Sequence, residues 1–111
     1  VYRGGLGVHL AMVAMGGGLG MAIDLSRVPG VDAEQDSIIL YSETPGRFIV
    51  TIDPKHRLSF ESIMDGFPHA CAGTISSGTD LVINGLKGRP LIRLPLSGLK
   101  AAWKRPFGGL I

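Results

Sequence analysis

The chain has a single cysteine and no long hydrophobic run. One cysteine, Cys71, cannot build an internal disulfide framework or a multi-cysteine zinc site, so the sequence predicts a reduced, cytoplasmic setting. The apolar stretch over residues 6–15 is shorter than the roughly 20 residues that a membrane-spanning helix requires. We therefore expect no membrane segment.

Aromatic residues are scarce, at 6% of the chain, and the last quarter contains almost no acidic residue. The bases of that quarter are Lys87, Arg89, Arg93, Lys100, Lys104 and Arg105. Because the formal net charge is only +2 and no aromatic side chains are interleaved with these bases, the pattern does not predict nucleic-acid binding. We interpret the basic stretch as a solvated face, or as a surface that meets acidic residues elsewhere in a larger protein.

Length and hydropathy together favour one domain of a larger protein. The 111 residues suffice for one small domain and are too few for two. Hydrophobic residues make up 45% of the chain, and the mean hydropathy of +0.30 is high for a small free-standing domain. Either a partner covers part of the surface, or the chain belongs to a longer polypeptide. Because the sequence starts at Val1 rather than at a methionine, we favour the second interpretation.

Hydrophobic periodicity predicts an α+β domain in which helices pack mainly on one face of a mixed β-sheet. Helices are expected over residues 6–15, around 35–40, from 54 to about 64, and over 96–104. Strands are expected over residues 19–25, 48–53, 70–76, 80–85 and 90–94, the last two forming a hairpin. Gly16–Gly17–Gly18 is expected to end the first helix, and Asp32 to cap the second. Asp53 followed by Pro54 is the favoured order for the start of the third.

Two of these expectations concern burial. The nearly continuous apolar run from Phe48 to Ile52 predicts a strand that is buried on both faces. With the helix after it and the strand over residues 70–76, it would form a right-handed βαβ crossover. Trp103, four residues after Leu99, is expected to anchor a core or an interface.

The polar turn over residues 41–47 carries an unexpected pair of opposite charges. A turn of this kind needs Pro45 and Gly46, but it does not by itself need Glu43 and Arg47. These two residues either bind a substrate or pair with each other across the turn. An exposed pair stabilises a fold little, by about 0–1 kcal/mol, and on the residues alone the structural interpretation leads.

Two glycine clusters are candidates for a nucleotide or phosphate site. Gly4–Gly5 opens a predicted helix, where free backbone amides and the helix dipole can hold a phosphate, and Arg3 can add a charge-assisted contact. Ordinary helix capping by glycine explains the same residues, and the sequence leaves both interpretations open. The cluster over residues 16–20 follows a helix and matches neither a dinucleotide fingerprint nor a Walker loop.

The histidines and the cysteine do not predict a reactive or metal centre. His9, His56 and His69 have no metal-ligand spacing with one another or with Cys71, and two ligands are too few for a closed site. We therefore expect no metal in this chain. Among its apolar neighbours, Cys71 is interpreted as an inert buried thiol. The sequence indicates no catalytic Ser/His/Asp set.

Four segments, in order, resemble the C-terminal domain of phosphoribosylformylglycinamidine synthase, an enzyme of the aminoimidazole ribonucleotide synthetase superfamily. They are residues 4–8 opening a helix, residues 19–25, residues 41–50, and the closing leucine-rich helix with Trp103. The block of Glu43, Gly46 and Arg47 is the most specific part. The chain departs from the family pattern at two places. Tyr2 and Arg3 stand where many members have Ser-Asp, and the predicted strand at Cys71 lacks the more usual Ile-Gly-x-Val sequence.

The resemblance implies a role in de novo purine biosynthesis. The intact enzyme would use ATP and magnesium, bound mostly by a preceding domain, to activate the formamide oxygen of formylglycinamide ribonucleotide. Ammonia from a glutaminase domain or subunit would then give the amidine, ADP and phosphate. For this chain the resemblance implies a substrate-phosphate site at Arg3, Gly4 and Gly5, and a pair at the side of the cleft, Glu43 and Arg47. It implies no catalytic residue here, so the chain alone would be inactive.

Two other interpretations remain at this point. One is another member of the same ATP-dependent superfamily, of the aminoimidazole ribonucleotide synthetase or selenophosphate synthetase type. The other is a non-catalytic dimerisation or binding module with a basic C-terminal face, and a homodimer is compatible with either. The Glu43 and Arg47 block favours the synthase.

Overall fold

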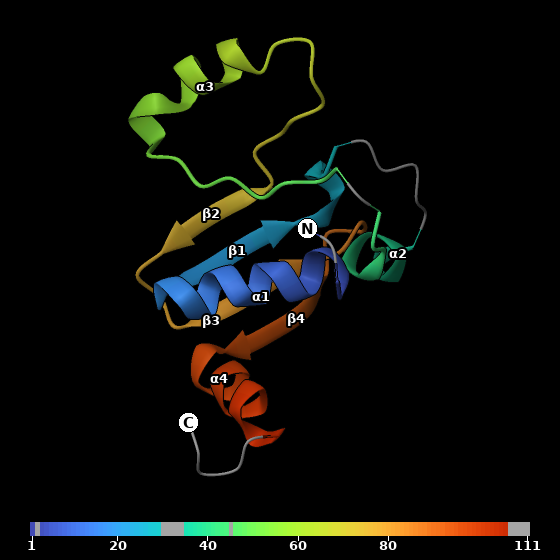
Figure 1. Ribbon diagram of the computed structural model, residues 1–111, viewed down its shortest axis with the longest axis vertical. Coiled ribbons are helices and arrows are strands. Elements are labelled where there is room, and N and C mark those ends of the chain that lie inside the picture. Colours follow the sequence, from blue (N-terminus) through green and yellow to red (C-terminus); the bar gives the residue numbers. More distant parts are fainter. Residues whose placement is uncertain (2, 30–34, 45, 107–111) are drawn as a thin grey trace.

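The computed structural model describes residues 1, 3–29, 35–44 and 46–106. Ten helical or strand elements are described within these ranges (Figure 1). They are α1 (Gly5–Gly17), β1 (Gly20–Asp24), the 3₁₀ helix η1 (Leu25–Arg27), α2 (Asp36–Tyr41), the 3₁₀ helix η2 (Pro54–His56), α3 (Arg57–Ile63), β2 (Gly73–Ser76), β3 (Asp80–Asn84), β4 (Pro90–Pro95) and α4 (Leu96–Lys104). None of the described helices is long and apolar enough to cross a membrane.

A mixed four-stranded sheet in the order β2-β1-β3-β4 forms the centre of the domain. β1 runs parallel to β3 and antiparallel to β2, and β3 and β4 form an antiparallel hairpin. Gly88 makes the hairpin turn with a φ of 77°, a left-handed value that suits glycine. The predicted α+β class and the predicted hairpin are confirmed.

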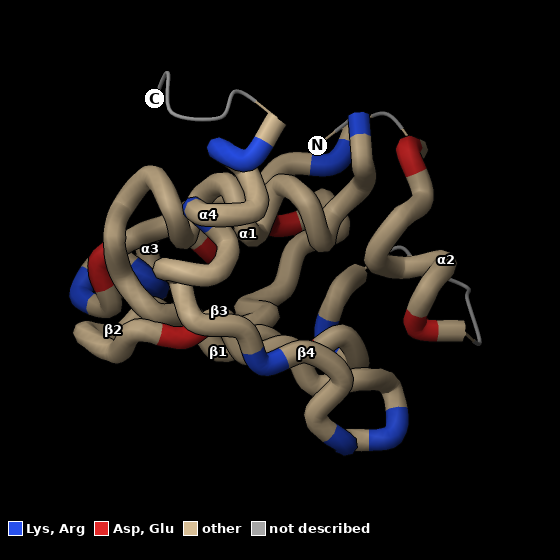
Figure 2. Tube along the Cα trace, turned by 90° about the horizontal axis from the view of Figure 1, so that it is seen from below, with Lys and Arg blue, Asp and Glu red and all other residues tan. Residues whose placement is uncertain are grey.

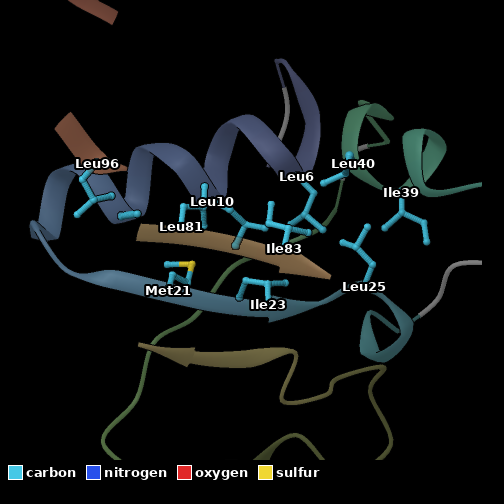
Figure 3. Close-up of a cluster of buried hydrophobic side chains, with 11 residues drawn as sticks. Leu6, Leu10, Met21, Ile23, Leu25, Ile39, Leu40, Leu81, Ile83 and Leu96 are labelled. Carbon is cyan, nitrogen blue, oxygen red and sulfur yellow. The ribbon is translucent and has the colours of Figure 1, made fainter. Parts of the chain in front are cut away.

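The core lies between α1 and one face of this sheet (Figure 3). In the register of β1 and β3, Met21 pairs with Leu81 and Ile23 pairs with Ile83, so all four side chains share that face. Ala22, which alternates with them, is exposed. The remaining buried side chains come from the helices and their ends: Leu6, Leu10, Ala14, Leu25, Ile39, Leu40 and Leu96. The helices that contribute to the core thus lie on one face, as expected.

The glycines after residue 15 end α1 as the sequence predicts. Gly18 adopts a φ of 66°, and its N–H donates to the carbonyl of Ala14 at 2.9 Å. This is a left-handed helix end, which glycine adopts at little cost. For α2, Gln35 occupies the N-cap position, and the predicted cap, Asp32, lies outside the described residues.

The predicted strand over residues 48–53 is wrong. Within the described part of the chain these residues pair with no strand, and Phe48 is 85% exposed. Ile49 is partly buried against the core, whereas Val50 and Ile52 are exposed. The β-branched run supplies strand propensity, but a strand also needs a neighbour to accept its hydrogen bonds. The predicted βαβ crossover to β2 is therefore absent.

The third predicted helix begins where the sequence places it. The Asp53 carboxylate accepts the Lys55 N–H at 3.0 Å, and Pro54 opens the 3₁₀ helix η2 that leads into α3. Its apolar side chains do not reach the core, since Leu58 is 81% exposed. In Figure 1, α3 stands away from the sheet. The expectation of a buried thiol fails, since Cys71 is exposed. Trp103 is exposed and so does not belong to the core, and the interface role expected as its alternative stays a prediction.

The start of α1 is pressed against the end of α2 at Gly5. This residue has a φ of 77°, and a Cβ placed on it would lie 2.7 Å from the Leu40 carbonyl oxygen and from the Tyr41 Cα. Contacts that close do not occur between real side chains and backbone. Only glycine fits this position, for reasons of both conformation and space.

We expect Leu25→Ala to lower the free energy of unfolding by about 3 kcal/mol, because it leaves a cavity at a side chain that is 1% exposed. Leu58→Ala is the matched control at 81% exposure and should change stability by less than about 0.5 kcal/mol. Urea denaturation followed by circular dichroism measures both. Equal losses from the two variants would contradict the assignment of the core.

We expect Gly5→Ala to destabilise the fold by at least roughly 1–3 kcal/mol, since the left-handed conformation and the contact with α2 both oppose a side chain. Gly16→Ala is the control in the same helix, because nothing lies within 4 Å of a Cβ at that position. It should be neutral or stabilise by about 0.5–1 kcal/mol. Thermal unfolding of the two variants should therefore shift in opposite directions or by clearly different amounts.

Candidate functional site

The candidate site comprises the start of α1 and the turn that follows α2. Gly4 is the N-cap of α1 and adopts a φ of 83°. The carboxylate of Glu43 accepts the Gly4 N–H at 2.9 Å, and this contact is exposed. Arg3 is exposed and directly precedes Gly4 in the chain. The fold thus brings two sequence-predicted groups together, the helix start at residues 3–5 and Glu43.

Arg47 binds the other side of the same turn. Its Nη1 donates to the carbonyl of Ile39 at 3.4 Å, and its Nε donates to the carbonyl of Thr44 at 3.4 Å. Its Nη2 donates to the carbonyl of Ser42. Ile39 lies near the C-terminal end of α2, where helical carbonyls lack partners within the helix. A guanidinium at this end also matches the negative pole of the helix dipole.

Glu43 and Arg47 do not form an ion pair with each other, so the predicted cross-turn pairing is wrong. The ion pairs of the described residues lie elsewhere: Arg27 with Asp24, Arg57 with Glu61, and Arg93 with Asp80. Instead, each charge serves a different helix end. The carboxylate of Glu43 lies at the positive N-terminal end of α1, and Arg47 lies at the negative C-terminal end of α2.

The opposite charges are therefore explained by the fold, although a turn considered alone does not require them. The sequence could not show this, because the meeting of the start of α1 with the end of α2 is a long-range contact. Two further contacts hold the turn: the backbone nitrogen of Val1 donates to the Arg47 carbonyl at 2.9 Å, and the hydroxyls of Ser42 and Thr44 lie 2.7 Å apart.

Both glycines at the helix start are also explained by backbone requirements. A Cβ on Gly4 would lie 2.8 Å from the Val8 side chain, and Gly5 is buried against α2. The Gly4 amide already binds an anionic oxygen, which is the chemistry that a phosphate site at a helix N-terminus uses. A phosphate on the same amide has to take the place of the carboxylate.

The two groups whose pKa values are shifted, Asp24 and Arg57, lie away from this site. The hydroxyl and backbone N–H of Ser26 donate to the Asp24 carboxylate and hold its pKa below the usual value. That carboxylate stabilises the fold at neutral pH, and the contribution is lost as the pH falls. The Glu61 carboxylate, 3.0 Å from Arg57, raises the pKa of that guanidinium.

The described residues contain no group of three or more histidine, cysteine, aspartate or glutamate side chains arranged to hold a metal ion. His9, which the sequence left without a role, directs its Nδ1 to the Gly5 carbonyl at 2.9 Å. An open hollow of about 160 Å³ lies between α1, β4 and α4 and is lined by apolar side chains and Tyr41. This lining suits contact with an apolar surface rather than catalysis.

The basic residues of the last quarter do not share one element. Lys87 and Arg89 lie in the turn between β3 and β4, and Lys100 lies on α4. Arg93 on β4 pairs with Asp80 at 3.6 Å. Figure 2 shows the basic segments spread over the hairpin turn, β4 and α4 rather than gathered at one place.

Comparison with known proteins gives matches across the chain. The family model described as "AIR synthase related protein, C-terminal domain" matches residues 3–84. The phosphoribosylformylglycinamidine synthase subunit PurL of Thermoplasma volcanium is 32% identical over 111 residues, which is 100% of this chain and 14% of the relative. PurL of Thermococcus gammatolerans is 38% identical over 101 residues, 91% of this chain and 14% of the relative. The chain therefore spans only a small part of these relatives.

A solved structure supports the fold. The structure described as T. maritima PurL complexed with ATP superposes with a TM-score of 0.75 at 20% identity, covering 88% of this chain and 17% of that one. This likeness confirms the mixed sheet with its helices. With the family model matching well over half of the residues, the resemblance seen in the sequence is confirmed: this chain belongs to the family of C-terminal domains of AIR synthase related proteins.

Proposed function

We propose that this chain is the C-terminal domain of a phosphoribosylformylglycinamidine synthase, which acts in de novo purine biosynthesis. The observation that carries the proposal is the match to PurL of Thermoplasma volcanium, which is 32% identical along all 111 residues. A second PurL, from Thermococcus gammatolerans, is 38% identical over 91% of the chain. The motif of Glu43, Gly46 and Arg47 lies within the region matched by the family model.

In the proposed reaction, the formamide oxygen of formylglycinamide ribonucleotide attacks the γ-phosphorus of ATP and ADP leaves. Ammonia then adds to the activated carbon and phosphate leaves, which gives the amidine. The preceding domain of the same protein holds ATP and magnesium, and a glutaminase domain or subunit supplies ammonia. The contribution of this chain is to hold and enclose the riboside.

The start of α1 is the proposed site for the substrate phosphate. The backbone amides of Gly4 and Gly5 lie at the positive end of the helix, and Arg3 supplies a cation next to them. The exposed bond from Gly4 to Glu43 supports the proposal, because it places an anionic oxygen on this amide. In the complex, the phosphate takes the place of that carboxylate. By this proposal the protein is cytoplasmic, and this domain alone is inactive.

The substrate assignment is tested with the intact protein that contains this domain. Purified enzyme with ATP, magnesium and ammonium chloride should release ADP and phosphate only when formylglycinamide ribonucleotide is added, and mass spectrometry should detect the amidine. ATP consumption that instead requires the amidine product, or selenide, would assign the protein to another branch of the superfamily. The same assay on this domain alone should show no turnover.

The phosphate site is tested with Arg3→Ala in the intact protein. We expect the KM for the riboside to rise roughly 10-fold or more, because a charge-assisted contact is lost, with little change in kcat. Arg27→Ala is the control, since that arginine is exposed and pairs only loosely with Asp24, at 3.9 Å. An unchanged KM in Arg3→Ala would remove the helix start as the phosphate site and leave the substrate assignment standing.

A further inference from the structure

Arg47 holds the turn on both sides of Glu43. Its guanidinium contacts the carbonyl of Ser42, directly before Glu43, and the carbonyl of Thr44, directly after it. A third contact, to Ile39, fixes the guanidinium to the end of α2. Glu43 thus lies at the centre of a turn that Arg47 holds on both sides. Its Oε1 accepts the Gly4 N–H at 2.9 Å.

The three contacts of Arg47 with the carbonyls of Ile39, Ser42 and Thr44, called the clamp below, depend on the shape of the arginine side chain. A guanidinium presents five N–H donors in a planar fork, so one side chain can serve three carbonyls at once. A lysine carries the same charge as a single point at the end of a flexible chain. It can satisfy the dipole of α2 but cannot hold the carbonyls on either side of Glu43 in one geometry.

We propose that Arg47 is a positioning residue that acts through Glu43, holding its carboxylate on the Gly4 amide and thereby setting how readily the substrate phosphate binds at the start of α1. This inference rests on the proposed function. An amide that is already occupied binds a phosphate with an apparent affinity reduced by the occupied fraction. Glu43 therefore acts as an internal competitor, and Arg47 determines how fully it occupies the amide.

The kinetic test is a double-mutant cycle in the intact protein, with Glu43→Gln and Arg47→Lys. Each single variant should lower the KM for the riboside about 3- to 10-fold, because each weakens the competing carboxylate. The KM for ATP should not move. The double variant should differ little from Glu43→Gln, since Arg47 acts through a charge that is no longer there. Additive effects, or a raised KM in Arg47→Lys, would overturn the proposal.

Hydrogen exchange of the Gly4 amide gives a readout that needs no activity. Exchange in the N-terminal peptide should be faster in both single variants than in the wild type. The matched controls are Arg57→Lys and Glu61→Gln, an exposed arginine and glutamate that bond at 3.0 Å on α3. These controls should change neither the KM nor the exchange. Unchanged exchange in Arg47→Lys, with an unaltered denaturation midpoint, would show that Arg47 does not position Glu43.

The two proposals can fail separately. If the intact protein does not turn over the riboside at all, the proposed function fails while the exchange experiment still tests the clamp. If turnover is present and the cycle is additive, the function stands and the positioning role fails.

Discussion

The candidate site depends on the close approach of α1 to α2. At Gly5 the two helices leave no space for a side chain, since a Cβ would lie 2.7 Å from the backbone of residues 40 and 41. Leu6 of α1 and Leu40 of α2 are both buried in the core, so apolar burial holds the contact together. Because α2 ends there, the turn that follows it begins beside the start of α1. The Gly4 amide and the Glu43 carboxylate meet as a result of this packing.

The electrostatics of the turn follow from the same arrangement. The C-terminal end of α2 presents a negative potential, and the N-terminal end of α1 beside it presents a positive one. Arg47 and Glu43 match these two poles, and each also satisfies backbone groups that the helices leave without partners. The two residues therefore stabilise the junction through contacts with two different helix ends.

How much the sequence predicts depends on how local each feature is. The helix over residues 96–104 was predicted with its observed bounds, because Pro106 and the apolar spacing are local signals. The sequence singles out Glu43 and Arg47 but does not give their hydrogen-bond partners, because Gly4 and Ile39 reach them through tertiary contacts. The wrong prediction of a strand at Phe48 has the same origin. The residue types give the strand propensity, but they do not show whether a neighbouring strand is present to pair with.

Many of the apolar residues behind the high mean hydropathy lie on the surface rather than in the core. Phe48, Leu58, Ile63 and Phe67 are each more than 60% exposed. Leu58 and Ile63 belong to α3, which stands away from the sheet (Figure 1). Trp103 of α4 is 58% exposed. Exposed apolar surface of this extent is typical of an interface. The proposed synthase requires such a surface, because a C-terminal domain that encloses a substrate has to pack against the domain that holds ATP.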